Sequence, residues 1–165
     1  MMQMASTDLV GESSAMRRVR TLVDRVAGTD ASVLVVGESG TGKELVAQAL
    51  HAGSQRANRG FRAINCGAIP ATLMESELFG FEKGSFTGAT RTHDGVVGQA
   101  HGGTLFLDEI TEMPMETQPP LLRFLETRKY FRVGGTQELS TDVRVVAATN
   151  RAPASAVREN RLREG

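Results

Sequence analysis

The stretch from Ser32 to Glu44 reads SVLVVGESGTGKE. It begins with a short run of β-branched and aliphatic residues, which is typical of a buried strand, and continues into a glycine-rich segment. An apolar pattern at helical spacing follows over residues 45–50. This order of strand, loop and helix is the context that a phosphate-binding loop, or P-loop, requires.

The segment Gly37–Glu44, GESGTGKE, carries the residue types that hold phosphate. Its glycines let backbone N–H groups turn toward phosphate oxygens, and Lys43 can reach the β- and γ-phosphates. The general pattern ends in a Ser or Thr that ligates Mg²⁺, whereas Glu44 stands there, so a metal ion needs ligands from elsewhere. A glycine-rich turn that merely joins strand to helix is the alternative. The candidate nucleotide-binding residues are Gly37, Glu38, Ser39, Gly40, Thr41, Gly42, Lys43 and Glu44.

A second motif, TLFLDE at residues 104–109, is an apolar strand that ends in two acids. Open α/β sheets bind ligands at the carboxyl ends of their strands. There Asp108 would hold Mg²⁺, and Glu109 would orient and deprotonate an attacking water. Taken in isolation, two acids after a strand are as often a helix cap or a solvated turn. The glycine-rich loop upstream favours the catalytic interpretation.

A third strand is predicted at residues 143–150, VRVVAATN, and it ends in Thr149 and Asn150. The Asn150 amide is a candidate to sense the γ-phosphate or to position water, and an ordinary turn residue is an equal alternative.

Helices and strands alternate along the rest of the chain. We expect helices at residues 13–27, from Pro70, and from near Thr117 or with a kink there, and a strand at residues 61–65. This order predicts one α/β domain with a parallel sheet covered by helices on both faces. Two glycine-marked stretches, residues 80–103 and 130–142, are expected to project as insertions.

Composition excludes several classes of protein. Basic and acidic residues both number 19, so the chain lacks the overall positive charge of a nucleic-acid-binding protein. The single cysteine, Cys66, cannot form an internal disulfide, and the three histidines lack metal-ligand spacing. The N-terminal residues do not resemble a signal peptide, and no segment is long and apolar enough for a membrane span. We therefore expect a cytoplasmic protein without a membrane partner.

The stretch Leu78–Thr90, LFGFEKGSFTGAT, places Phe86 between glycines at a flexible tip, which suggests a surface for a partner. It resembles the GAFTGA loop of bacterial enhancer-binding proteins, the NtrC-type AAA+ activators that engage sigma-54 in the RNA polymerase holoenzyme. The resemblance runs from about Leu9 and includes LVGESSAM, GESGTGKE, FRAINCGAIP, GGTLFLDEI, RVGG at 132–135 and VRVVAATN, all in the order of the family.

This resemblance implies a three-layer P-loop NTPase core of the AAA+ type that hydrolyses Mg-ATP. By likeness, Lys43 belongs to Walker A, Asp108 and Glu109 to Walker B, and Thr149 and Asn150 to sensor I. Asn65 matches the asparagine that pairs with the Walker B glutamate as a switch. Glu44 is usual in the family. The implied sigma-54 contacts are at the loop Gly84, Ser85, Phe86, Thr87, Gly88 and Ala89, and the second insertion resembles a loop that moves with it.

Three departures from the family pattern are visible. Ser85 replaces an alanine, Phe81 stands where Tyr is common, and Pro119 and Pro120 fall in a helix. The chain also ends at Gly165, where the family continues into further strands, a helical lid and sensor II. We therefore expect a disordered tail at residues 1–8 and a partial AAA+ domain at residues 9–165.

Arg163 matches the first of two arginines that reach across a subunit boundary of the ring, which is a hexamer in the family. The resemblance includes no DNA-binding domain, so we expect no sequence-specific DNA binding. Two alternatives stay open: a nucleotide- or sigma-54-binding module without turnover, and an unrelated AAA+ remodeller. The second would not need the GSFTGA and RVGG loops.

Overall fold

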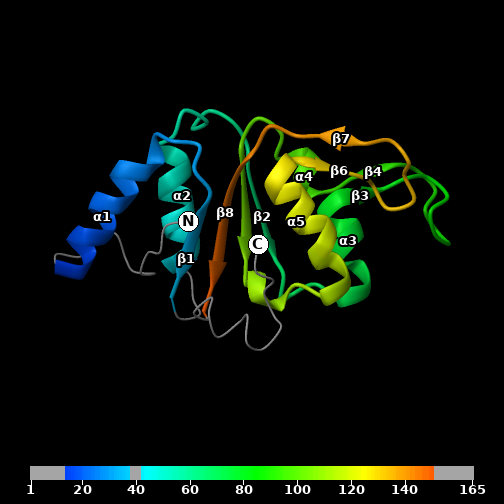
Figure 1. The fold of residues 1–165 in the computed structure, drawn as a ribbon, viewed down its shortest axis with the longest axis horizontal. Helices are drawn as coiled ribbons and strands as arrows, with labels where there is room; N and C mark the ends of the chain where they lie inside the picture. The colour runs from blue at the N-terminus through cyan, green and yellow to red at the C-terminus, as the bar shows by residue number, and fades with distance from the viewer. Residues whose placement is uncertain (1–13, 38–41, 151–165) are drawn as a thin grey trace.

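The computed structural model describes residues 14–37 and 42–150, with side chains from residue 17 onward. A four-stranded sheet lies at its centre, with helices on both sides (Figure 1). The helices are α1 (Ser14–Ala27), α2 (Gly42–Ala52), α3 (Ala71–Phe79), α4 (Val96–Gln99) and α5 (Gln118–Thr127), with 3₁₀ turns η1 (Ile110–Glu112) and η2 (Met115–Thr117). The strands are β1 (Val33–Val36), β2 (Phe61–Asn65), β3 (Gly80–Phe81), β4 (His93–Asp94), β5 (Thr104–Asp108), β6 (Lys129–Tyr130), β7 (Leu139–Ser140) and β8 (Arg144–Thr149).

The central sheet is parallel and has the strand order β1-β8-β5-β2. Its register aligns Val36 with Thr149 and Asn65 with Asp108. The carboxyl ends of all four strands therefore meet at one edge of the sheet, which we call the nucleotide edge. This is where an open α/β sheet forms its ligand site.

Each face of the sheet packs against its own helices. Side chains alternate along β8, so Val146 and Ala148 pack with α1 and α2, whereas Val145 and Ala147 pack with α3, α4 and α5. All six residues of β8 are buried, as expected for a central parallel strand. The predicted α/β architecture with three layers is thus confirmed. In the part of the chain that is described, no helix has the length and apolar character of a membrane span.

The proline pair lies in the first turn of α5, because Pro119 and Pro120 directly follow Gln118. Backbone N–H groups of a first helical turn have no partner inside the helix, so proline is tolerated there. The sequence-based expectation of a start near Thr117 is confirmed.

The insertions consist of two short hairpins, β3–β4 and β6–β7, which Figure 1 shows on the side of the molecule away from α1. The expected limit of the first insertion is wrong. Residues 96–100 do not project, because Val97 and Ala100 are fully buried in the core with α3 and α5. A four-residue helix lacks enough periodicity to be recognised as core from sequence.

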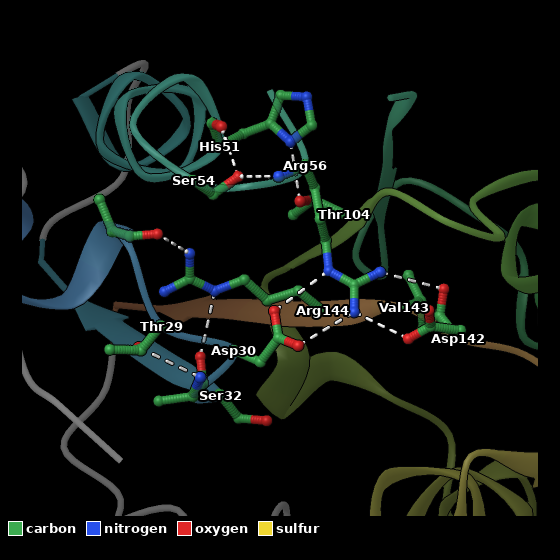
Figure 2. Close-up of polar contacts among 12 residues, drawn as sticks. Thr29, Asp30, Ser32, His51, Ser54, Arg56, Thr104, Asp142, Val143 and Arg144 are labelled. Carbon is green, nitrogen blue, oxygen red and sulfur yellow. Dashed lines mark hydrogen bonds and ion pairs between the residues drawn. The ribbon is translucent and has the colours of Figure 1, made fainter. Parts of the chain in front are cut away.

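A network of arginines closes the end of the sheet opposite the nucleotide edge (Figure 2). Arg144, at the start of β8, is 1% exposed and donates hydrogen bonds to the carbonyl oxygens of Val26, Ala27 and Ala31. These carbonyls belong to the end of α1 and the turn after it, where a cation also suits the helix dipole. Arg56 bridges the carboxylates of Asp30 and Asp142 beside it.

We predict that Arg144→Met lowers the free energy of unfolding by about 3 kcal/mol, because three carbonyl groups, two of them in buried hydrogen bonds, lose a charged donor. Urea unfolding followed by circular dichroism measures this change. Arg17→Met, on the exposed surface of α1, is the matched control and should change stability by less than about 0.5 kcal/mol. Equal effects of the two substitutions would contradict the anchoring role of Arg144.

Candidate nucleotide site

Lys43 lies in the first turn of α2 at the nucleotide edge, and its side chain is 1% exposed. Its ammonium nitrogen Nζ lies 3.3 Å from the carbonyl oxygen of Gly37 and 3.3 Å from Glu109 Oε1. A buried ammonium is strongly disfavoured without a negative partner. Glu109 supplies that charge from the end of β5, which lies on the other side of β8 from β1.

Glu109 occupies a left-handed backbone conformation, with φ 53° and ψ 50°. For a residue other than glycine this conformation costs roughly 1 kcal/mol. It makes a sharp turn after β5, and the Glu109 carboxylate meets Lys43 from there. The strain coincides with the residue that the sequence predicts to activate water.

Asp108 is the last residue of β5, and its Oδ1 accepts the backbone N–H of Glu109 at 2.9 Å. Burial raises the pKa of the Asp108 carboxyl, although the Glu109 N–H and the Lys43 ammonium act in the opposite direction. The carboxylate charge is therefore poorly compensated, and a cation near it would relieve that. An oxygen ligand of this kind suits Mg²⁺, which takes one or two carboxylates together with phosphates and water. Within residues 14–37 and 42–150 no three acidic, histidine or cysteine side chains cluster into a protein-only metal cage.

Asn65 ends β2 directly beside Asp108 in the register. Its Oδ1 accepts the N–H of Gly67 at 2.9 Å, and the side chain is exposed. A Cβ atom placed on Gly67 would lie 3.4 Å from Asn65 Oδ1 and 3.8 Å from Glu109 Cβ. Asn65 and Glu109 thus face the same turn, but the Glu109 carboxylate contacts Lys43 here. The switch role of Asn65 stays a prediction.

Thr149 ends β8, between the strands that carry the two motifs, and Asn150 follows it. The carbonyl oxygen of Thr149 accepts the N–H of Gly37 at 3.1 Å, which fixes the start of the P-loop to β8. The Thr149 hydroxyl is buried and lies 3.3 Å from the hydroxyl of Thr111 in η1. Sequence reasoning missed Thr111, since a threonine just after an acidic pair carries no pattern of its own.

Some predicted residues are not among those described. Glu38, Ser39, Gly40, Thr41 and Arg163 lie outside the described residues, as do the segments 1–13 and 151–165. Of the remaining P-loop residues, Glu44 is exposed in the first turn of α2, where an acid suits the helix dipole.

The predicted partner loop, residues 84–89, forms a tight turn at the tip of the first insertion. Gly84 and Gly88 have positive φ angles, and the Gly84 N–H donates to the carbonyl of Ala89 at 2.8 Å. Phe86 is 48% exposed and packs edge-on against Phe81, with 4.9 Å between ring centroids.

The geometry agrees with comparisons to known proteins. The model of the Sigma-54 interaction domain matches residues 9–165. The chain belongs to this family. As a member of the sigma-54 interaction domain family, it carries the AAA+ type of α/β fold that the motifs predicted.

Relatives support the same assignment. The DNA-binding transcriptional regulator NtrC of Azospirillum brasilense is 54% identical over 94% of this chain and 32% of its own length. The luminescence regulator LuxO of Vibrio campbellii is 50% identical over 94% of this chain and 34% of its own length. A crystal structure of NtrX from Brucella abortus in complex with ATP superposes with a TM-score of 0.85, at 42% identity, over 96% of this chain and 35% of that one. The chain thus spans about a third of the length of these relatives.

We predict that Asp108→Asn stabilises the metal-free domain by roughly 0.5–1 kcal/mol at pH 7. A carboxyl whose pKa is raised on folding binds its proton more tightly in the folded state, so stability falls as pH rises above the ordinary value of 3.8. Asparagine keeps an acceptor for the Glu109 N–H and carries no charge.

Urea unfolding in EDTA between pH 7 and pH 4 tests this prediction. The gain should shrink as the pH approaches 4, because Asp108 of the wild type then becomes neutral. Asp24→Asn, on the exposed face of α1, is the control and should change stability by less than about 0.5 kcal/mol. A loss of stability in Asp108→Asn at pH 7 would refute the assignment of an undercompensated charge.

Proposed function

We propose that this domain is the ATP-binding and ATP-hydrolysing core of a sigma-54-dependent transcriptional activator. The observation that carries the proposal is the position of the Lys43 ammonium, held between the Gly37 carbonyl and the Glu109 carboxylate at the nucleotide edge. This ion pair supports the proposal, because a cation that can bind phosphate and an acid that can activate water lie in contact with each other.

The ion pair suggests an order of events when nucleotide binds. Phosphate oxygens compete with Glu109 for the Lys43 ammonium, since both are anions that seek the same donor. Glu109 is then released to accept a proton from water at the γ-phosphate, with Asn65 and Asn150 at hand to hold the carboxylate and the water. Asp108 would hold Mg²⁺, which neutralises charge on the β- and γ-phosphates when bound.

Two further supports come from the sequence and from the relatives. Phe86 and Thr87 are exposed in the GSFTGA loop, which extends from the hairpins on the side of the molecule away from α1 (Figure 1). We propose that this loop contacts sigma-54 in RNA polymerase and that hydrolysis occurs at subunit interfaces of a ring. Arg163, the candidate to reach the neighbouring subunit, lies outside the described residues. The NtrX structures in complexes with ADP and with ATP belong to relatives of the same fold.

The first test is Mg-ATP turnover by the purified chain over a wide range of protein concentration. Specific activity should rise with concentration, because neighbouring subunits complete each site. Lys43→Ala should abolish nucleotide binding, and Glu109→Gln should keep binding but lower turnover by at least about a hundredfold. Binding without turnover at any concentration would instead indicate a nucleotide-binding module.

The second test concerns the partner loop. Phe86→Ala should abolish retention of the chain on immobilised sigma-54, because the exposed ring is the largest apolar group at the tip of the loop. Leu73→Ala on α3 is a matched control, since Leu73 is 49% exposed and lies outside the loop. If both variants bind sigma-54 as the wild type does, the loop is not the contact surface.

A further inference from the structure

The two insertions are joined by backbone hydrogen bonds into one unit. We call residues 82–92 the first loop and residues 131–138 the second loop. The N–H of Val133 donates to the carbonyl of Gly80 at 2.9 Å, and the N–H of Glu82 donates to the carbonyl of Val133 at 3.0 Å. Phe81 and Val133 thereby form a parallel bridge between the hairpins. Moving Val133 of the second loop away from the β3–β4 hairpin must break both bonds.

Charged side chains reinforce this bridge. Arg132 of the second loop pairs with Glu82 and with Asp94, at the start and beyond the end of the first loop. Hydrogen bonding to Asp94 is the main reason why the pKa of the Arg132 guanidinium is raised, and burial opposes it. All these groups are partly exposed, so the pairs contribute less than a buried network would.

The two loops also meet closely at Ser85 and Gly134. Gly134 has a φ angle of 76°, and a Cβ atom added to it would lie 2.5 Å from the Cβ of Ser85. No such contact occurs between real Cβ atoms, so only glycine fits at position 134 while Ser85 is in this place. The backbone of the second loop therefore rests directly on the side chain of residue 85.

The Ser85 hydroxyl is enclosed at this contact and has no hydrogen-bond partner among the described residues. The Nε atom of Arg132 in the second loop is also buried without a hydrogen-bond partner among the described residues. An enclosed polar group without a partner destabilises the state that encloses it, because water would satisfy the group in the open state. The contact between Ser85 and Gly134 is therefore sterically tight, but the enclosed Ser85 hydroxyl lowers its stability.

We propose that Ser85 and Gly134 form a catch that positions the first loop, and that the Ser85 hydroxyl shifts this catch toward release. The role of the released loop in sigma-54 engagement rests on the function proposed above, whereas the catch itself does not. Phe86 packs on Phe81, and Phe81 takes part in the bridge to Val133, so the aromatic tip and the second loop are supported by the same residue of β3. Opening the catch therefore loosens the support under Phe86. Ser85 is thus a positioning residue for Phe86.

Amide hydrogen exchange of Glu82 and Val133 reports separation of the two insertions beside the catch, since the Glu82 N–H donates to the second loop and the Val133 N–H donates to β3. Ser85→Ala keeps the Cβ contact and removes the hydroxyl without a partner, so exchange of these two amides should slow by about tenfold. Ser140→Ala, at an exposed serine of the β6–β7 hairpin, is the matched control and should leave the exchange unchanged. Unchanged or faster exchange in Ser85→Ala would overturn the proposal.

A pair of substitutions tests the steric part. Gly134→Ala should speed exchange of Glu82 and Val133, both through the collision with Ser85 and through the positive φ angle. In the Ser85→Gly background the collision is absent. The factor by which Gly134→Ala speeds exchange should therefore be at least about fivefold smaller in that background than in the wild type. Equal effects in the two backgrounds would mean that no contact links the two positions.

Exchange is measured without sigma-54, which separates this inference from the proposed function. Global stability from urea unfolding should differ little between wild type and Ser85→Ala, because local opening is a smaller event than unfolding. One outcome is that exchange follows the expected pattern while Phe86→Ala leaves sigma-54 retention unaffected. That result would support the Ser85–Gly134 catch and would contradict the assignment of sigma-54 as the partner of the loop. If exchange does not follow the pattern, the catch is wrong whatever the loop binds.

Discussion

The parallel register of the central sheet is the constraint on which the rest of the structure depends. Because β1, β8, β5 and β2 run in one direction and end at one level, the P-loop, the acidic pair and the end of β8 are brought together although they are far apart in the chain. A buried lysine at that edge then requires a nearby anion, and Glu109 provides it at 3.3 Å. This pairing of a buried cation with an acid at the edge of the sheet is best suited to phosphate chemistry.

The two ends of the sheet differ in how well their charged and polar groups are compensated. At the nucleotide edge, charge is undercompensated at Asp108 and backbone strain is concentrated at Glu109, both of which favour ligands over stability. At the opposite end, arginines satisfy carbonyl oxygens and carboxylates from several connections and hold the layers together.

Much of the fold could be predicted from sequence because its signals are local. The β-branched run before GESGTGKE, the helical spacing after it, and TLFLDE each report one element, and parallel order follows from their alternation. The helix start beside Pro119 follows from the chemistry of a missing N–H group. Contacts between residues that are far apart in the chain could not be predicted in this way. Nothing in the pattern at Arg144 indicates that it caps α1, and neither Thr111 nor the contact of Ser85 with Gly134 has a sequence signature.

The Arg144 anchor also has a mechanical consequence. It joins the end of α1 to the beginning of β8, and both elements extend from that point (Figure 1). A helix of 14 residues and a strand of 6 residues both span about 20 Å. Arg144 therefore fixes the C-terminal end of α1 against the first residue of β8, and a shift of α1 and the turn after it along the sheet would have to break three hydrogen bonds of one guanidinium.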